Sequence, residues 1–478
     1  MKKNLARAIG DIDERFIREA DEYRTWTIDW RRILIPALCV LLVTVSIIHF
    51  RHRAVSDFSL DDYYICKAEI PSYRAPRQED YLKHEQYTQE ARKYYNFYWE
   101  YRRTVMSYSA ILNDFTGRMI AIMTDMNEPG ENLVYSPVSL FIALSMLADG
   151  AEGVTRKELL DFIGISSLEE LETLNRALMI FNNREGTKTV REANSLWLDR
   201  KLNYNREVLE NISRNFGTDS FHGTMGSAQY NKAFHSWLNE RTGNILKEEV
   251  QSLKFTDKTL FAIASTMFFQ DKWITEFDRN NTYKAVFHAL NGEENVDMMY
   301  NRFPVGVYYD RAEFTALQLD MGDGVTILLA LPKEGYSAEE VMANNDFHYV
   351  AANLAEIYDW EQMEENRCII DLHLPRFDIS STYHFDGEEF REMQLKSLGA
   401  DPDFSGLLKD TVKEVIIDHS CRLKADEEGI TAAAFTVEQG LGAVMPEQIK
   451  EMIFDRPFIF DIRDEAGISL FAGIVNHP

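Results

Sequence analysis

The 478-residue sequence has few of the residues that hold small or irregular folds together. It contains only four cysteines, Cys39, Cys66, Cys368 and Cys421, and no two of them form a CxxC pair. This argues against a disulfide framework and against zinc-ribbon or thioredoxin-like sites. Glycine (24 residues) and proline (12 residues) are scarce, and 45% of the residues are hydrophobic. Collagenous, low-complexity and disordered classes are therefore excluded.

Positive charge is also scarce, and the common catalytic motifs are missing. Lys and Arg number 51 against 77 Asp and Glu, which gives a net charge of −26. A surface this acidic repels phosphate backbones, so nucleic acid is not an expected partner. The sequence has no GxSxG, HExxH, GxxxxGK[ST] or helix-opening GxGxxG motif. We expect no enzyme, no metal and no cofactor, although a triad assembled from distant residues stays open.

One long hydrophobic run is present, at residues 33–50. Its first sixteen residues carry no charge, Arg31 and Arg32 precede it, and Arg51 follows it. With His49 and Phe50 the run just reaches the roughly 17 residues that a membrane-spanning helix needs. A cleaved signal peptide and a buried core helix are the alternatives. The long leader, the lack of a cleavage site and the lack of an amphipathic face favour a signal-anchor helix.

The charges around this run predict an orientation. Eight Lys and Arg residues precede it and fewer follow closely, which predicts that residues 1–32 are cytoplasmic. The chain after residue 50 would then face the extracellular side of the cell membrane. The lipid bilayer is the expected partner of residues 33–50.

Residues 51–107 are predicted as a linker or stalk, and residues 108–478 as one α+β domain. From Tyr81 to Phe115 aromatic and aliphatic residues recur at spacings of three and four, which predicts a helix. This helix either forms a stalk or packs on the body's own surface, and its tyrosines favour the second. Beyond it the patterns alternate irregularly, without a 20–50-residue repeat. A helical run at 133–147 is followed by strand-like runs at 193–198, 261–269, 325–331, 368–374, 453–462 and 468–475.

Residues 424–450 form a long segment between two strand signals. It reads KADEEGITAAAFTVEQGLGAVMPEQIK. A loop of this length in a compact domain is usually functional or disordered. Its part from Ile430 to Val437 nevertheless favours a strand. The segment can therefore be an exposed loop or an inserted strand, as in proteins that release stored strain by loop insertion.

This segment resembles the reactive-loop hinge of the serpin family. Glu427, Glu428 and Gly429, followed by Thr431 to Ala434, match the family's hinge. Other family segments follow in order across residues 108–478. They are Asn132–Ser139, Gly150–Thr155, Ala193–Trp197, Asn239–Ile245, Phe268–Trp273, His373–Phe377, Asp403–Gly406, Asp455–Phe458 and Gly473–Pro478.

The resemblance implies a fold and a mechanism. The serpin fold has three β-sheets with surrounding helices and an exposed reactive-centre loop. Inhibitory serpins are suicide substrates, in which a protease cuts the loop and stays covalently attached while the loop inserts into the central sheet. The implied function is a membrane-tethered inhibitor of extracellular serine proteases, with the protease as covalent partner and a monomeric serpin domain. The alternative is a non-inhibitory serpin that acts as a binding or structural protein.

The resemblance also assigns site residues. The hinge comprises Glu427, Glu428, Gly429, Ile430, Thr431, Ala432, Ala433 and Ala434. If Gly429 is the fifteenth residue before the cut, the reactive bond is Ala443–Val444, and a longer loop would shift it by two or three residues. Ile430, Ala432, Ala434 and Thr436 would then face the core, and Glu438 would be costly to bury. A polar shutter of Ser136, Ser139, Asn239 and His419 and a breach tryptophan, Trp273, complete the assignment.

The reactive loop also limits the target. No Lys or Arg occurs from Gly429 to Ile449, which disfavours trypsin-like proteases. Small and apolar residues near the cut favour elastase-like or subtilisin-like serine proteases, and cysteine proteases stay open.

Overall fold

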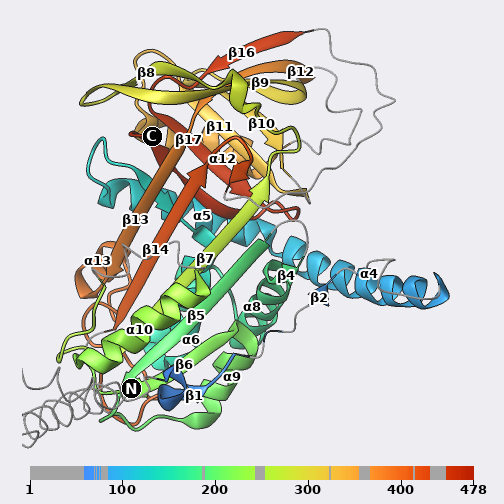
Figure 1. Ribbon diagram of the computed structural model, residues 1–478. Coiled ribbons are helices and arrows are strands. Elements are labelled where there is room, and N and C mark those ends of the chain that lie inside the picture. The colour runs from blue at the N-terminus through green and yellow to red at the C-terminus, as the bar shows by residue number, and fades with distance from the viewer. Residues whose placement is uncertain are drawn as a thin grey trace, which may run out of the picture. The chain divides into compact units, whose positions relative to one another are not determined.

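A computed structural model describes residues 59–478 apart from 69, 71–72, 75, 77–83, 186–188, 243–252, 322–323, 355–366, 413–414 and 431–447. Leu60–Pro478 form one compact unit. Its described strands make two nine-stranded sheets (Figure 1). Three sheets were expected. The difference arises because the long strand β9 (Gly292–Asp310) pairs with β12 along its middle and with β10 at its end, which joins two groups of strands into one sheet.

The first sheet contains β15, which is formed by two residues of the expected hinge, and we call it the central sheet. Its order is β1-β6-β5-β7-β15-β14-β13, with β2 and β4 beside β5. The strands are β1 (Tyr64–Cys66), β6 (Thr218–Gly223), β5 (Thr189–Asp199), β7 (Phe261–Lys272), β15 (Gly429–Ile430), β14 (Ile416–Ala425), β13 (Phe377–Phe385), β2 (Tyr73–Arg74) and β4 (Arg184–Glu185).

The second sheet has the order β16-β12-β9-β10-β11-β17-β18-β3, and β8 pairs with β9. Its other strands are β16 (Ile449–Ile453), β12 (Arg367–Pro375), β10 (Phe314–Asp320), β11 (Thr326–Pro332), β17 (Phe458–Arg463), β18 (Ser469–Val475), β3 (Leu133–Tyr135) and β8 (Tyr283–Ala289). The run expected as one strand at 453–462 is divided, because β16 ends at Ile453 and β17 begins at Phe458.

Helices cover the sheets, and one helix lies in the core. They are α4 (His84–Ser107), α5 (Ser109–Met126), α6 (Pro137–Gly150), α7 (Gly153–Ile163), α8 (Leu168–Asn182), α9 (Arg206–Phe216), α10 (Ala228–Arg241), α11 (Ala338–Met342), α12 (Asn345–Ala352) and α13 (Gly387–Glu392), with short 3-10 turns η2 (Leu60–Tyr63) and η5 (Arg279–Asn281).

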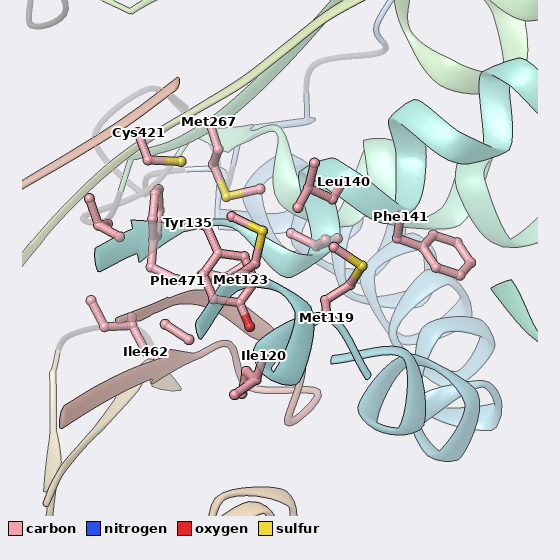
Figure 2. Packing of buried hydrophobic residues seen from close by; sticks show 14 of the residues in the cluster. Met119, Ile120, Met123, Tyr135, Leu140, Phe141, Met267, Cys421, Ile462 and Phe471 are labelled. Carbon is pink, nitrogen blue, oxygen red and sulfur yellow. The ribbon is translucent and has the colours of Figure 1, made fainter. Parts of the chain in front are cut away.

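Helix α6 is buried along its whole length, as its apolar sequence on every face requires. It contacts both β7 of the central sheet and β18 of the second sheet. The helix expected from residue 133 begins only at Pro137, because Ser136 caps it and the preceding residues form β3. Around α6 the core joins Met123 of α5, Leu140 of α6, Met267 of β7 and Cys421 of β14 (Figure 2).

Residues 60–107, expected as a linker or stalk, lie in the same compact unit as the rest of the domain. Strand β1 pairs with β6 at the edge of the central sheet. The ring of Tyr98 on α4 lies 6.2 Å from that of Phe181 on α8, and Arg102 donates to the carbonyl of Glu465 at 2.8 Å. The expected single helix breaks at Tyr108 into α4 and α5. Helix α4 therefore packs on the surface of its own domain.

The expected membrane anchor at residues 33–50 lies outside the described residues. Across the described part of the chain, no helix combines the length and the apolar character that crossing a membrane requires.

Candidate functional site

The centre of the site is a stretch of the central sheet where two strands lack a common partner. Strands β7 and β14 run parallel and pair directly only from Ala262 with Ile416 to Ser265 with His419. Among the described residues, nothing pairs with Thr266–Gln270 of β7 or with Ser420–Lys424 of β14 on the sides that face each other. We call these two segments the unpaired stretch.

Strand β15 closes the end of the unpaired stretch. Both of its residues pair antiparallel with β7, Gly429 with Lys272 and Ile430 with Asp271. Ile430 also pairs antiparallel with Ala425 on β14. Ile430 is completely buried. The hinge has thus already entered the central sheet by two residues, in the direction that a continuing strand would follow.

A tight turn leads from β14 into β15, and it depends on Gly429. The N–H of Asp426 donates to the carbonyl of Gly429 at 3.0 Å, and the N–H of Glu428 donates to the Asp426 carboxylate at 3.0 Å. A Cβ on Gly429 would lie 2.3 Å from the carbonyl oxygen of Asp271. Only glycine lets the hinge backbone come this close to β7.

The hinge residue Glu427 is held by an ion pair. Its side chain is 3% exposed and accepts hydrogen bonds from the guanidinium of Arg376, which lies between β12 and β13. The hydroxyl of Thr282 also donates to it at 2.6 Å. Burial raises the pKa of Glu427, but the hydrogen bonds from Arg376 and Thr282 outweigh burial and bring it below its usual value. Glu427 therefore stays ionised and fixes the start of the hinge.

Trp273 follows β7 directly at the same end of the unpaired stretch. Its side chain is 2% exposed, and its indole N–H donates to the carbonyl of Asp426 in the hinge turn at 2.8 Å. A cavity of about 470 Å³, lined in part by Arg376 and Glu427, lies beside this turn. The structure thus brings Trp273 into contact with the hinge, at the position where a strand would begin to insert.

Three of the four expected shutter residues lie together under the other end of the unpaired stretch. Ser136 caps α6 and donates its backbone N–H to Nε2 of His419 at 3.1 Å. The N–H of Ser139 donates to the hydroxyl of Ser136 at 3.3 Å. The thiol of Cys421 lies 3.3 Å from the same His419 nitrogen. The three shutter residues and Cys421 are all buried.

His419 is neutral in this environment. Complete burial lowers the pKa of its imidazole to about 3, against a small opposing effect from the backbone of Ser265. Because Nε2 accepts from Ser136, the ring proton belongs on Nδ1. A neutral imidazole can accept here without burying a charge.

The fourth expected shutter residue, Asn239, lies elsewhere, near the end of α10. Among the described residues its side-chain oxygen has no hydrogen-bond partner. Its expected place in the network is filled by two residues that sequence reasoning missed, Ser265 of β7 and Asn194 of β5. The hydroxyl of Ser265 lies 2.7 Å from Oδ1 of Asn194 and 3.0 Å from the carbonyl of Ser139. The sequence signal was available, since Ser265 is a polar residue on the buried face of an otherwise apolar run.

The remaining hinge residues Thr431, Ala432, Ala433 and Ala434 and the expected reactive bond Ala443–Val444 lie outside the described residues. Within the described residues, no three His, Cys, Asp or Glu side chains gather into a group that could hold a metal ion.

Comparisons with known proteins agree with this geometry. Human neuroserpin is 27% identical over 373 residues, which cover 73% of this chain and 86% of neuroserpin. The crystal structure of human glycosylated kallistatin aligns with a TM-score of 0.68 and 22% identity, covering 78% of this chain and 99% of kallistatin. Human thyroxine-binding globulin in complex with thyroxine aligns with a TM-score of 0.65 and 22% identity, with the same coverage. At these identities the two structures show the fold alone.

A sequence profile of one family covers most of the domain. The profile described as serpin (serine protease inhibitor) matches residues 110–478, which is well over half of the chain. This protein therefore belongs to the serpin family, whose members are commonly protease inhibitors.

Proposed function

We propose that this serpin is a suicide inhibitor of extracellular serine proteases that inserts its cleaved loop between β7 and β14. The observation that carries the proposal is the unpaired stretch with β15 at its end. Two parallel strands can accept an antiparallel strand between them, and β15 already has that direction. Each new pairing would satisfy backbone groups that the unpaired stretch leaves without a partner strand.

The register of β15 predicts where each loop residue would go. If the pairing of Ile430 with Asp271 and Ala425 continues, Ala434 comes to lie between Met267 and Cys421. Both of these side chains are buried and lie in the core around α6 (Figure 2). Only a small side chain fits such a position without disturbing the packing, which agrees with the alanine in the sequence.

Two further positions follow from the same register. Thr436 would lie between Ser265 and His419 and so would replace their direct pairing in the shutter. Glu438 would lie between Ile263 and Ile417, two buried apolar residues that cannot pair with a carboxylate. Thr436 is therefore well suited to insertion, and Glu438 opposes completion of the strand.

The chemistry supports covalent trapping. The serine oxygen of the protease would bond to the carbonyl carbon of Ala443, while the bond from that carbon to the nitrogen of Val444 breaks and the nitrogen takes up a proton. The loop would remain attached to the protease as an ester. Insertion of the 14 residues from Ile430 to Ala443 would carry the ester about 48 Å along the sheet.

Elastase-like and subtilisin-like enzymes are the proposed targets, because the loop offers no basic residue before the cut. Residues 33–50 are proposed to anchor the protein in the cell membrane with the serpin domain outside, as their apolar run and the preceding basic residues favour. An anchor would keep the protein in the membrane pellet after carbonate extraction, and deletion of residues 1–50 would release it. Release of the intact chain by carbonate would contradict the anchor and leave the inhibitor proposal standing.

The first test mixes the full-length chain, in a mild non-ionic detergent, with pancreatic elastase and separately with subtilisin. We expect an SDS-stable complex and a released peptide whose mass corresponds to residues 444–478. Protease with its catalytic serine replaced by alanine is the control, and it should form no such complex. Complete cleavage without complex, together with no gain in thermal stability, would instead support a binding or structural role.

A further inference from the structure

Glu192 is a carboxylic acid in the interior of the central sheet. It lies on β5, opposite Met267 of β7, and its side chain is 3% exposed. One carboxylate oxygen accepts a hydrogen bond from the amide of Asn194 at 2.9 Å. The other makes no well-aligned hydrogen bond among the described residues, although the side-chain amide of Asn182, which is likewise without such a bond, interacts with the carboxylate. A buried carboxylate in this position lowers the stability of the folded protein. Its presence is therefore a reason to look for a role beyond packing.

A chain of hydrogen bonds connects Glu192 to the shutter. The amide nitrogen of Asn194 donates to Glu192, and its oxygen accepts from the hydroxyl of Ser265 at 2.7 Å. Ser265 lies opposite His419 on the last pair that joins β7 to β14. The charge on Glu192 therefore sits two hydrogen bonds away from the pair that must separate when a strand inserts.

Among the described residues, no charged side chain contributes to the pKa shift of Glu192. Burial raises the pKa of Glu192 to about 7, and the amides of Asn194 and Asn182 oppose this rise. The groups that face it are uncharged: Met267 and Ser265 on β7, Asn182 on α8, and Thr218 of β6, which pairs with Asn194. The same network includes His419, which burial holds neutral.

The helices beneath the sheet carry one more titratable pair, Asp149 of α6 and Glu172 of α8. Burial and the neighbouring Glu172 raise the pKa of Asp149 to about 7. Neither residue contributes to the pKa shift of Glu192. This pair can alter the pH dependence of stability. A test of Glu192 therefore needs a variant that leaves Asp149 and Glu172 unchanged.

The proton on Glu192 decides how the network is arranged. The hydroxyl of Ser265 has one proton and two acceptors in reach, Asn194 and the carbonyl of Ser139 on α6. When Glu192 is ionised, it holds the Asn194 amide with its oxygen towards Ser265. When Glu192 is protonated, the Asn194 amide can turn its oxygen towards Glu192 and accept from the carboxylic acid, at the cost of the 3.3 Å hydrogen bond from the amide nitrogen to the carbonyl of Phe216. Ser265 is then free to donate to Ser139. Protonation would thus tie β7 to α6.

We propose that Glu192 is a pH-sensitive positioning residue for strand insertion, and that its ionised form lets β7 and β14 separate more readily. The inference rests on the proposed insertion mechanism. Within the described part of the closed sheet, the ionised carboxylate has only the amides of Asn194 and Asn182 to stabilise it, and separation of the strands would admit water to it. Ionisation therefore destabilises the closed sheet more than the opened one.

The test measures uptake of a synthetic strand. A fluorescein-labelled peptide with the sequence of residues 430–443 is incubated with the full-length chain in detergent between pH 5.5 and 8.5. Its incorporation is followed by native gel electrophoresis. We expect the uptake rate to rise with pH. The total rise should be about tenfold for each unit by which the pKa of Glu192 is lower in the opened sheet than in the closed sheet. Glu192→Gln should take up peptide slowly and at a rate nearly independent of pH.

Asp320→Asn is the matched control. Asp320 lies on β10 of the second sheet, and burial raises its pKa to about 7 as well. This variant should keep the wild-type uptake profile. Thermal unfolding shows that each variant is folded, and Glu192→Gln should be at least as stable as wild type at pH 8 because it removes a buried charge.

The outcomes separate the two proposals. If wild type and Glu192→Gln share one pH profile, the role of Glu192 is overturned and the insertion mechanism stands. If no protein takes up peptide at any pH, the insertion mechanism is overturned and the role of Glu192 with it.

Discussion

His419 and Ser265 lie opposite each other on the last pair that joins β14 to β7. Each also contacts the start of α6: His419 accepts from the N–H of Ser136, and the Ser265 hydroxyl lies 3.0 Å from the carbonyl of Ser139. The buried helix therefore holds both strands at the point where the unpaired stretch begins. Any strand that inserts past this point must break these contacts or replace them.

The first prediction concerns Ala434, which the register places between Met267 and Cys421. Ala434→Arg would bring a charge into the core and block insertion at that residue. We expect loss of the SDS-stable protease complex and rapid cleavage of the variant as a substrate, as measured on denaturing gels. Ala433→Arg is the matched control, because its side chain would point to the other face of the strand. An equal loss of complex in both variants would contradict the predicted register.

The second prediction concerns Glu438, which would be buried between Ile263 and Ile417 late in insertion. Glu438→Ala removes this carboxylate and should speed the final part of insertion relative to hydrolysis of the ester. The stoichiometry of inhibition, measured by titration of residual protease activity, should fall. Gln439→Ala serves as control because Gln439 would face outwards. An unchanged stoichiometry in Glu438→Ala would mean that the strand stops short of this residue.

The third prediction concerns the ion pair between Arg376 and Glu427. Arg376→Met would leave a buried carboxylate with Thr282 as its remaining donor. Removal of one partner of a buried pair is strongly destabilising, and we expect a loss of about 2–3 kcal/mol because Arg376 itself is 41% exposed. Urea denaturation measures the change, and adding Glu427→Gln should recover part of it.

The pair of Arg302, whose side chain is 55% exposed, and Asp371 provides the control for this loss. Arg302→Met should cost clearly less stability than Arg376→Met. The lowered pKa of Glu427 adds a pH test. The ionised form of Glu427 should stabilise the folded protein fully above pH 4.5, which is the ordinary pKa of glutamate. This stabilisation should be lost as the pH falls through the lower pKa of Glu427 in the folded protein. Equal losses for Arg376→Met and Arg302→Met would show that burial of Glu427 does not matter.

The fourth prediction concerns the neutral His419. Its pKa is about 3 in the folded protein against 6.5 when exposed, so the unfolded chain binds an extra proton between these values. The stability that His419 contributes is full above pH 6.5 and falls by about 1.4 kcal/mol per unit as the pH drops below it. His419→Gln should be less stable than wild type at pH 7, and this difference should shrink as the pH drops from 7 to 5. Urea midpoints that differ equally at pH 7, 6 and 5 would contradict this.

Local sequence was enough for several parts of the site. The helical run expected at residues 133–147 corresponds to α6, which Ser136 caps and which begins only at Pro137. The strand character expected from Ile430 onwards agrees with β15, whereas the turn before Gly429 was not expected from the sequence. These features depend on a few neighbouring residues, whose backbone preferences act over one or two turns.

Contacts between distant strands were not accessible in this way. Asn194 and Ser265 are 71 positions apart, and nothing in either local pattern indicates that they share a hydrogen bond. The same limit explains why Asn239 was expected in the shutter, whereas it lies on α10. The tyrosine-rich stripe favoured packing on the domain's own surface, and α4 does pack there, but the sequence did not indicate that α8 would be its partner.

The sequence by itself determined which residues of the 424–450 segment are small and that none from Gly429 to Ile449 is basic, because both follow from side-chain identity alone. Only the tertiary structure decided where two strands lie side by side without a common partner. Strands β7 and β14 are about 150 residues apart in sequence, and their register leaves Thr266–Gln270 and Ser420–Lys424 unpaired. Backbone pairing is not encoded locally, because the same N–H and C=O groups occur in every residue except proline, which lacks the N–H. It is the packing of both strands on the buried helix α6 that fixes which of these groups remain without a partner strand.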